Sequence, residues 1–199
     1  MKECVYIMSR DKWNDNQNTV PIRLMTGDPG QYFEPITKRN IGDSLYLEVR
    51  MQGCLKRCIG CWYPKAKAMY GGEKHYVQEI IEILDGIKQV GRKVTGIILT
   101  GGEPFLQPVA ILELVNYTKP RDMKIICYSG YYFEELLGWG DARRQMLDCV
   151  DILIDGPFDE SKICDDRLPW VTTSDQRIID VKKSLESREI ILCEDDKLW

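Results

Sequence analysis

Three cysteines stand close together in the first third of the chain, and thiolates are strong metal ligands. Cys54, Cys58 and Cys61 follow the spacing C-x3-C-x2-C, and no fourth cysteine lies near them. A [4Fe–4S] cluster usually takes four thiolates, so three would leave one iron without a protein ligand. An open coordination position is typical of metal sites that do chemistry rather than hold structure. The trio therefore predicts a reactive iron–sulfur cluster.

Zinc binding and chance clustering are the alternatives for the cysteine trio. Zinc sites usually show paired C-x2-C units, or one such unit with distant histidines. Only Cys58 and Cys61 have that spacing, and the chain has one histidine, His75, to complete such a site. A zinc site is conceivable but matches the spacing less well. His75 precedes a predicted helix and is better interpreted as a residue at a helix start.

Length and composition predict a soluble enzyme of one domain. The 199 residues are enough to bury a substantial core, and the net charge of −4 argues against a nucleic-acid partner. No stretch approaches the ~18 apolar residues of a membrane span, and the N-terminus lacks the apolar segment of a secretory signal. We therefore expect a cytoplasmic protein without membrane contact. In that reducing compartment the scattered cysteines are expected to be buried small hydrophobic residues, namely Cys4, Cys127, Cys149, Cys164 and Cys193.

The beginning of the chain differs in pattern from the rest. Residues 1–43 show no regular hydrophobic period and contain the turn signal Gly27-Asp28-Pro29-Gly30. We interpret them as an N-terminal extension with a turn, in which short strands are an open alternative. From Ser44 to about Met51 apolar and polar residues alternate, which predicts a strand. Residues 44–199 are predicted to form the core, with a C-terminal tail.

Strand and helix patterns alternate along this core. Short apolar runs predict further buried strands, and apolar residues at helical spacing predict the helices between them. This alternation predicts right-handed βαβ units and a parallel sheet. The predicted strands cover residues 94–100, 123–128 and 150–154, and the predicted helices cover residues 77–90, 109–117, 133–137 and 142–147.

Polar and glycine-rich signals follow each predicted strand directly. They are the cysteine trio, residues 101–104 (Gly-Gly-Glu-Pro), Ser129-Gly130 and Asp155-Gly156. In α/β barrels the loops after the strands build the active site. Four βα units are too few for a full eight-stranded barrel. The predicted fold is therefore α/β, a partial, open (β/α) barrel with its site on one rim.

Two of these signals, in this order, resemble the radical S-adenosylmethionine (SAM) superfamily. Its enzymes carry a C-x3-C-x2-C motif after the first strand, which the cysteine trio matches. They also carry a GGE-type motif after the second strand, which resembles Gly101, Gly102, Glu103 and Pro104. The resemblance implies the partial barrel of that superfamily, a [4Fe–4S] cluster and SAM as cofactors.

A closer resemblance, over roughly residues 44–182, is to the activating proteins of anaerobic ribonucleotide reductase. The chain departs from that family at residues 40–43 and 172–175, and it has an N-terminal segment and a tail from about Leu185 that the family lacks. These departures lie where partner contacts are expected. The similar segments are Gly60-Cys61-Trp62-Tyr63-Pro64, Tyr128-Ser129-Gly130-Tyr131, residues 150–158, Leu168-Pro169-Trp170 and Gln176-Arg177-Ile178-Ile179-Asp180.

The resemblance implies a complete activity. The reduced cluster, held by Cys54, Cys58 and Cys61, would cleave SAM to methionine and a 5′-deoxyadenosyl radical. That radical would abstract hydrogen from a glycine Cα of the reductase and leave a glycyl radical. Reduced flavodoxin or ferredoxin is implied as the electron donor. The protein's part in such chemistry is positioning, since the cofactors carry the reaction itself.

The resemblance also implies that the Gly-Gly-Glu-Pro segment contacts the methionyl ammonium of SAM. Gly101 and Gly102 permit close backbone approach to a ligand, and the Glu103 carboxylate is a natural acceptor. The alternative is an ordinary strand-to-helix turn with Pro104 at the helix start.

The remaining candidates have equally plain structural alternatives. Gly60 and Trp62 are implied adenine contacts, although Trp62 would also suit packing over the rim. Ser129 and Asp155 would contact the ribose or carboxylate of SAM, or a cation, whereas Asp155 before a glycine also suits a turn. The basic pair Lys56 and Arg57 would stabilise the reduced cluster or form a solvated loop face. Rim packing is the preferred role for the tyrosines Tyr128, Tyr131 and Tyr132.

Two other functions remain open from the sequence. One is a radical SAM enzyme that modifies a small molecule or a peptide, like the deazaguanine synthases, with residues 1–43 capping the barrel. The other is a non-catalytic iron–sulfur or zinc module.

Overall fold

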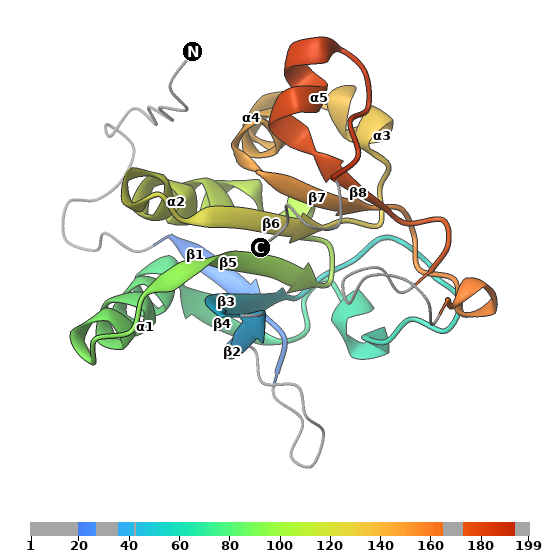
Figure 1. Cartoon of the computed structure of the whole chain (residues 1–199). Coiled ribbons are helices and arrows are strands. Elements are labelled where there is room, and N and C mark those ends of the chain that lie inside the picture. Colours follow the sequence, from blue (N-terminus) through green and yellow to red (C-terminus); the bar gives the residue numbers. More distant parts are fainter. Residues whose placement is uncertain (1–19, 27–35, 42, 165–172, 194–199) are drawn as a thin grey trace.

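In the computed structural model the described residues are 20–26, 36–41, 43–164 and 173–193, and they build one mixed sheet with its helices (Figure 1). The strands are β1 (Pro21–Leu24), β2 (Ile36–Ile41), β3 (Ser44–Met51), β4 (Glu73–Tyr76), β5 (Val94–Gly101), β6 (Lys124–Tyr128), β7 (Ile152–Asp155) and β8 (Arg177–Asp180). The α-helices are α1 (Val77–Gln89), α2 (Pro108–Thr118), α3 (Phe133–Leu137), α4 (Asp141–Cys149) and α5 (Val181–Ser187). Short 3₁₀ turns are η2 (Pro64–Lys67), η3 (Pro104–Leu106), η4 (Lys119–Arg121) and η5 (Glu160–Lys162).

The sheet has a parallel centre and antiparallel edges. Its order is β4-β1-β3-β5-β6-β7-β8, with β2 also paired to β3. The pairs β3–β5, β5–β6 and β6–β7 are parallel, as the strand–helix alternation predicts. The pairs of β1, β2, β4 and β8 are antiparallel. Because β4 and β8 stand at opposite ends of this order, the sheet is open over the described residues.

The described parts of residues 1–43 belong to the sheet itself. β1 pairs with both β3 and β4, and β2 runs antiparallel to β3 from Ile36 opposite Val49 to Ile41 opposite Ser44. The first parallel strand therefore has a neighbour on each side along its length. Residues 1–19 and 27–35, including Cys4 and the predicted Gly27–Gly30 turn, lie outside the described residues.

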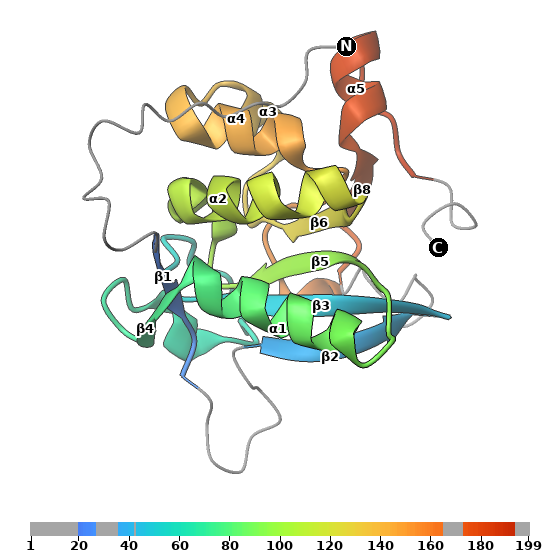
Figure 2. The ribbon, with the colours of Figure 1, turned by 90° about the vertical axis from the view of Figure 1, so that its left-hand side faces the viewer.

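The helices cover one face of the sheet. In Figure 2, α1 and α2 lie in front of the central strands, and α4 lies beside α2. Side chains from alternate positions of β3, such as Leu47 and Val49, point into the large apolar core on this face. Residues on the helix faces complete it, among them Ile80 and Leu84 of α1 and Ile111 of α2. The alternation of side chains along the strands and the spacing of apolar residues along the helices together explain how this core forms.

The other face of the sheet carries a smaller apolar cluster. It contains Tyr46, Ile98, Ile126, Ile154 and Ile178, each from a different strand. The apolar run of each central strand is buried on both sides, which explains why these strands read as continuous hydrophobic stretches. Within the described ranges, none of the helices is both long and apolar enough to cross a lipid bilayer.

Candidate active site

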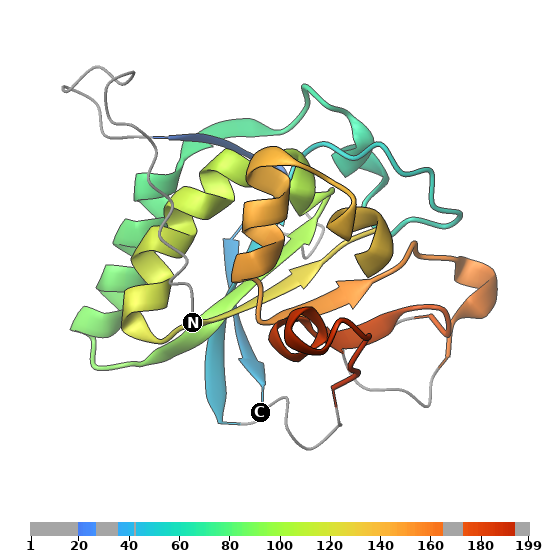
Figure 3. The ribbon, with the colours of Figure 1, turned by 90° about the horizontal axis from the view of Figure 1, so that it is seen from above.

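The predicted site residues meet at one edge of the sheet. Cys54, Glu103, Ser129 and Asp155 follow or end β3, β5, β6 and β7, which run parallel. In Figure 3 the arrowheads of β5, β6 and β7 point toward the turquoise segment that follows β3. We call this segment, residues 52–63, the cysteine loop. The loops after the parallel strands therefore share one rim, as the sequence predicts.

The two glycines after β5 lock against the start of the cysteine loop. Gly101 has φ +92°, and a Cβ there would lie 2.7 Å from the Met51 nitrogen. A Cβ on Gly102 would overlap the Gly53 carbonyl oxygen. The backbone NH of Gly102 donates to the Met51 carbonyl at 2.7 Å, and that of Glu103 donates to the Gly53 carbonyl at 2.8 Å. The close approach that these glycines permit is therefore an approach to the cysteine loop itself.

Glu103 is fully buried at the centre of the rim. Its carboxylate accepts hydrogen bonds from the Ser129 hydroxyl at 3.1 Å and from the backbone NH groups of Gly130 at 2.9 Å and Phe105 at 3.2 Å. Burial raises the pKa of Glu103 to about 7, and these hydrogen bonds only partly oppose the rise. The carboxylate thus ties the loop after β5 to the loop after β6.

Ser129 connects the same rim to its next strand. Its backbone NH donates to the Ile154 carbonyl of β7 at 2.9 Å, and its hydroxyl oxygen accepts from the Tyr131 NH at 3.0 Å. Its hydroxyl also donates to Glu103. Contact between Ser129 and SAM stays a prediction, while the structure assigns the hydroxyl a role within the rim.

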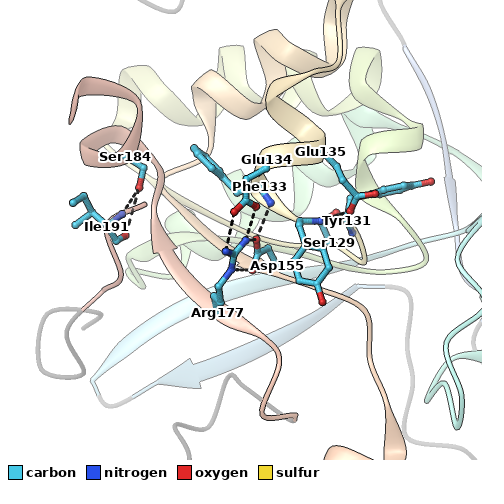
Figure 4. A network of polar contacts seen from close by, with 10 residues as sticks. Ser129, Tyr131, Phe133, Glu134, Glu135, Asp155, Arg177, Ser184 and Ile191 are labelled. Atoms are coloured by element: carbon cyan, nitrogen blue, oxygen red, sulfur yellow. Dashed lines mark hydrogen bonds and ion pairs between the residues drawn. The ribbon is translucent and has the colours of Figure 1, made fainter. Parts of the chain in front are cut away.

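Asp155 forms a buried ion pair that the sequence analysis missed. Its carboxylate accepts from the Phe133 NH at 2.7 Å and from Arg177 Nε at 2.9 Å, and it also contacts Arg177 Nη2. Arg177 binds Glu134 with both terminal nitrogens, at 3.0 and 2.7 Å, so it lies between two carboxylates (Figure 4). The Asp155 hydrogen bonds are the main reason that the Arg177 pKa is raised above its ordinary value.

Nothing in the local sequence around Arg177 marks this pair. The arginine lies 22 positions after Asp155 and begins an antiparallel strand, β8, that pairs with β7. The prediction of a turn after Asp155 agrees with Gly156, whose φ is +98°. A contact between Asp155 and SAM remains untested by this geometry.

The three cysteines are free thiols and are partly buried. Burial raises the pKa of the Cys54 thiol to about 11, and the nearby Glu103, Cys58 and Cys61 add smaller upward contributions. The trio therefore shares one neighbourhood with Glu103. Over the residues that the structure describes, no three His, Cys, Asp or Glu side chains are placed to hold a metal ion.

The donor chemistry of the loop fits an iron–sulfur cluster. Thiolate sulfur is the ligand that such clusters take, and three thiols on one short loop supply it. Metal binding would require the thiols to lose their protons, which a cluster achieves by direct coordination.

Gln52 closes the base of the cysteine loop. Its buried side-chain amide donates to the carbonyls of Lys65 at 3.0 Å and Ala68 at 2.6 Å. The Gly53 NH donates to the Ala66 carbonyl at 2.8 Å. The loop therefore leaves β3 and returns to η2 within a small hydrogen-bonded frame.

Gln107, at the start of α2, ties this frame to β1. Its amide nitrogen donates to the carbonyls of Arg23 at 2.8 Å and Gln52 at 3.0 Å, and its amide oxygen accepts from the Arg23 NH at 2.7 Å. Sequence reasoning missed both glutamines, because an isolated Gln carries no motif.

The far end of the cysteine loop lies against the segment that follows β7. Gly60 has φ +69°, and a Cβ there would overlap the Glu160 side chain. Trp62 is 56% exposed, and its ring is tilted by 59° to the Phe158 ring, with centroids 5.7 Å apart. Rim packing of Trp62 is therefore partial. The predicted adenine contacts of Gly60 and Trp62 stay predictions.

The two basic residues of the loop differ in their surroundings: Lys56 contacts other side chains, whereas Arg57 is exposed. Lys56 Nζ lies 3.9 Å from the Tyr131 ring centroid and 3.5 Å from a Glu135 carboxylate oxygen. Arg57 is exposed. Lys56 thus contributes a positive charge held beside the cysteines, whereas Arg57 matches the solvated alternative.

A buried charged group lies on the sheet face opposite the helices. Glu48 and Arg50 of β3 are 5% and 7% exposed, with 3.1 Å between their charged groups. Arg39 of β2 approaches Glu48 at 3.5 Å, and Arg50 donates to the Thr37 hydroxyl at 3.1 Å. Buried ion pairs contribute little to stability after desolvation. This group therefore adds buried charge to the mainly apolar packing on that face, a feature the sequence analysis did not assign.

Some predicted segments fall outside the described residues. Leu168-Pro169-Trp170 and Thr172 belong to residues 165–172, and the end of the tail is residues 194–199. His75 lies in β4, with Nδ1 2.9 Å from a Glu79 carboxylate oxygen in the first turn of α1, which agrees with a role at the helix start.

Comparison with known protein families gives a match over most of the chain. The family described as a 4Fe-4S single cluster domain matches residues 41–179. That range includes the cysteine trio, the Gly-Gly-Glu-Pro segment, Ser129, Asp155 and Arg177.

Curated proteins that resemble the chain share one name, anaerobic ribonucleoside-triphosphate reductase-activating protein. The protein from Vibrio cholerae is 31% identical over 154 residues, covering 74% of this chain and 94% of its own length. The protein from Pasteurella multocida is 30% identical over 142 residues, covering 69% and 88%. The protein from Escherichia coli K12 is 28% identical over 131 residues, covering 63% and 82%.

Among solved structures, QueE from Escherichia coli is similar to part of the chain. The match covers 55% of this chain and 52% of QueE, with 13% sequence identity and a TM-score of 0.39. A similarity of this size carries no argument about fold or function.

Proposed function

Because the chain belongs to the family of anaerobic ribonucleoside-triphosphate reductase-activating proteins and carries a 4Fe-4S single cluster domain, we propose that it is a radical SAM activating enzyme. Its substrate would be the anaerobic ribonucleoside-triphosphate reductase, on which it would generate a glycyl radical. The observation that carries the proposal is the placement of the cysteine loop against the Gly-Gly-Glu-Pro segment, in a chain that matches nearly the full length of these relatives.

The proposed architecture is a partial, open (β/α) barrel. Its wall would be the parallel strands β3, β5, β6 and β7, with α1, α2 and α4 outside. One feature supports it: the loops that follow these parallel strands share one rim. An activating enzyme needs such an opening, because its substrate is a segment of another protein.

Cys54, Cys58 and Cys61 are the proposed ligands of the [4Fe–4S] cluster. The match to a 4Fe-4S domain favours this cluster over zinc. When bound and reduced, the cluster would supply the electron that cleaves SAM. The chain's own contribution is to hold the loop at its base through Gln52, and to place Lys56 beside it, where positive charge favours added negative charge.

The proposed SAM site runs along the rim from the cysteine loop to β7. Gly60 and Trp62 would contact the adenine, and the segment formed by Gly101, Gly102, Glu103 and Pro104 would contact the methionyl ammonium. An ammonium near Glu103 would favour its ionised form, which offsets the burial that now raises its pKa. Ser129 and Asp155 would support the remaining polar groups of SAM, directly or by fixing their loops.

Electron supply and location complete the proposal. A small carrier protein, reduced flavodoxin or ferredoxin, would deliver the electron, and the reaction would take place in the cytoplasm. Neither nucleic acid nor a membrane is part of the proposed reaction.

An anaerobic assay tests the proposed function. The protein would be combined with SAM, reductant and the anaerobic reductase, and the mixture examined by electron paramagnetic resonance (EPR). We expect a glycyl radical signal with the wild-type protein and with a Cys193→Ala variant, and none with Cys58→Ala. Cleavage of SAM without that signal, or one equivalent of zinc without sulfide in the purified protein, would contradict the proposal.

A further inference from the structure

The cysteine loop carries a large exposed apolar side chain directly after each of its three cysteines. These side chains are Leu55, Ile59 and Trp62, which are 60%, 64% and 56% exposed. A single exposed apolar residue is common on a protein surface. Three of them at equivalent places beside the proposed cluster ligands form a pattern that a lone residue does not.

Two more exposed apolar side chains lie on the turn that follows η2. They are Met69 and Tyr70, which are 39% and 90% exposed. This turn packs against the start of the cysteine loop, since a Cβ on Gly53 would lie 3.5 Å from Met69 Sδ. Nine large apolar side chains are exposed in the described part of the chain, and five of them belong to residues 54–70. We call these five the loop surface: Leu55, Ile59, Trp62, Met69 and Tyr70.

The backbone behind the loop surface is bound to the rim. After β6, the Tyr131 ring centroid lies 3.9 Å from Nζ of Lys56. After β7, Asp159 forms a parallel bridge with Ile59, and the Glu160 NH donates to the Ile59 carbonyl at 3.3 Å. In Figure 1 the cysteine loop accordingly lies beside the orange turn that follows β7. An ordered backbone loses little entropy when a partner docks on its side chains.

Charge at the loop surface is nearly balanced. Four basic residues and no acidic residue occur between positions 54 and 70, namely Lys56, Arg57, Lys65 and Lys67. Three carboxylates from other segments oppose them: Glu135 lies 3.5 Å from Lys56, and Asp159 and Glu160 lie beside residues 59–60. Because four cations meet three carboxylates, the apolar side chains and not the charge distinguish this surface from its surroundings.

The reaction itself indicates what covers the loop surface. A glycine of the reductase must reach SAM beside the cluster, so the reductase must approach the cysteine loop. Apolar contact around the loop would also keep water out of a radical reaction. The single adenine of SAM is assigned to Trp62, and one ring is too small to cover the other four side chains. Aromatic, Met and aliphatic side chains are typical of the centre of a specific protein interface, whereas encounters with redox carriers are small.

We propose that Leu55, Ile59, Met69 and Tyr70 form the surface on which the anaerobic reductase docks, through apolar side chains near its radical glycine. This inference rests on the proposed function, because it takes the reductase as the substrate. It adds which residues of this chain hold the reductase while the glycine lies in the site. The electron carrier is the competing occupant, because it must also approach the cluster.

The rate of glycyl radical formation at varied reductase concentration tests the surface. The reconstituted protein would be mixed anaerobically with saturating SAM and with dithionite, so that no carrier protein is present, and the radical would be counted by EPR. We expect Tyr70→Ala and Leu55→Ser each to raise the reductase concentration at half-maximal rate by about tenfold and to change the maximal rate by less than about twofold. Leu55→Ile keeps the apolar area and should restore the wild-type value.

A direct binding measurement removes the dependence on turnover. Biolayer interferometry of the same reconstituted proteins with the reductase, without reductant, should show the dissociation constant rising by the same factor. Val90 provides a matched control, since it is 73% exposed at the end of α1, where the chain leads into β5 and away from the rim. Val90→Ser should change neither the dissociation constant nor the half-maximal concentration.

Two results would overturn the proposal. One is wild-type affinity for the reductase in both Tyr70→Ala and Leu55→Ser. The other is a defect that appears only when flavodoxin replaces dithionite, because the surface would then serve the carrier. Tyr70 lies outside the cysteine loop, so its variant decides the question if Leu55→Ser loses iron. A wild-type protein that binds the reductase but forms no glycyl radical would count against the proposed function alone.

Discussion

The rim of the sheet and the cysteine loop beside it are held in different ways. On the rim, Glu103, Ser129, Asp155 and Arg177 bind one another or nearby backbone NH groups, and two of these side chains are fully buried. In the cysteine loop the three thiols are free and partly exposed, and the loop is fixed at its base by Gln52. The rim is thus organised before any cofactor binds, whereas the loop depends on its cluster for completion. Mutations on the rim should therefore lower the stability of the metal-free protein, whereas mutations of the thiols should lower cluster binding.

The largest effect is expected from loss of a cysteine. Cys61→Ala should abolish cluster binding, because two thiolates are left where three are needed. The thermal unfolding midpoint of the metal-free protein should change little, since the thiol makes few buried contacts. Iron and sulfide content and a circular dichroism melt would measure both. Cys193→Ala is the control and should keep its iron, and retention of full iron by Cys61→Ala would refute the assignment.

The next effect concerns the pH dependence of stability through Glu103. Its folded pKa of about 7 lies above the ordinary value of 4.5, so the folded protein retains the proton across this window. The stability that the neutral carboxyl contributes is complete below pH 4.5 and is lost as pH rises through 7, by about 3 kcal/mol in full. Urea unfolding of the metal-free protein between these pH values should show this fall, and Glu103→Gln should remove it. If the free energy of unfolding fell equally with pH in both proteins, Glu103 would not be the cause and the prediction would be wrong.

Breaking the ion pair at the end of β7 should cost slightly less. Asp155→Ala leaves Arg177 without its buried partner and the Phe133 NH without an acceptor. We expect the free energy of unfolding to fall by about 2–3 kcal/mol, below the range for fully buried pairs because Arg177 is partly exposed. Asp148→Ala breaks the surface pair with Arg144 and should cost about 0.5 kcal/mol or less. Equal losses in the two variants would show that the rim is not specially ordered.

The smallest changes in the free energy of unfolding are expected for two glycine substitutions, and these changes have opposite signs. Gly102→Ala should destabilise by about 1–2 kcal/mol, because its Cβ would overlap the Gly53 carbonyl and push the rim from the cysteine loop. Gly86 lies within α1 with no atom near its Cβ position, so Gly86→Ala should stabilise by about 0.5–1 kcal/mol. Iron incorporation should fall only in Gly102→Ala. Denaturant unfolding and iron analysis would measure both, and a stable, fully loaded Gly102→Ala variant would disprove the close approach.

Prediction from sequence succeeded where short-range pattern determines structure. The strands predicted at residues 94–100 and 150–154 correspond to β5 (Val94–Gly101) and β7 (Ile152–Asp155), and the helical spacing from Val77 corresponds to α1. Because each parallel strand ends at the same edge, placing the polar signals after the strands also placed them together. The cluster domain and the family assignment, which rest on motif spacing, agree with the comparisons.

Prediction failed where a partner is distant in the chain. Short strands were left open for residues 1–43, but no local signal indicated that β2 pairs with β3 or that β1 pairs with β3 and β4. Gln107 reaches a carbonyl 84 positions earlier, and Arg177 reaches a carboxylate 22 positions earlier. Such contacts depend on how elements pack, which a pattern of single residues does not encode.

By itself the sequence determined the chemistry available to this protein: three thiols at cluster spacing, a Gly-Gly-Glu-Pro turn, and an order of strands and helices that brings them to one rim. The tertiary structure alone decided what each group contacts. Glycines that seemed free to meet a ligand press against the cysteine loop, and Trp139, which no motif marks, packs edge-to-face on Tyr131. The physical reason is that spacing along a chain fixes which residue types are near in sequence, whereas packing in three dimensions fixes which atoms touch.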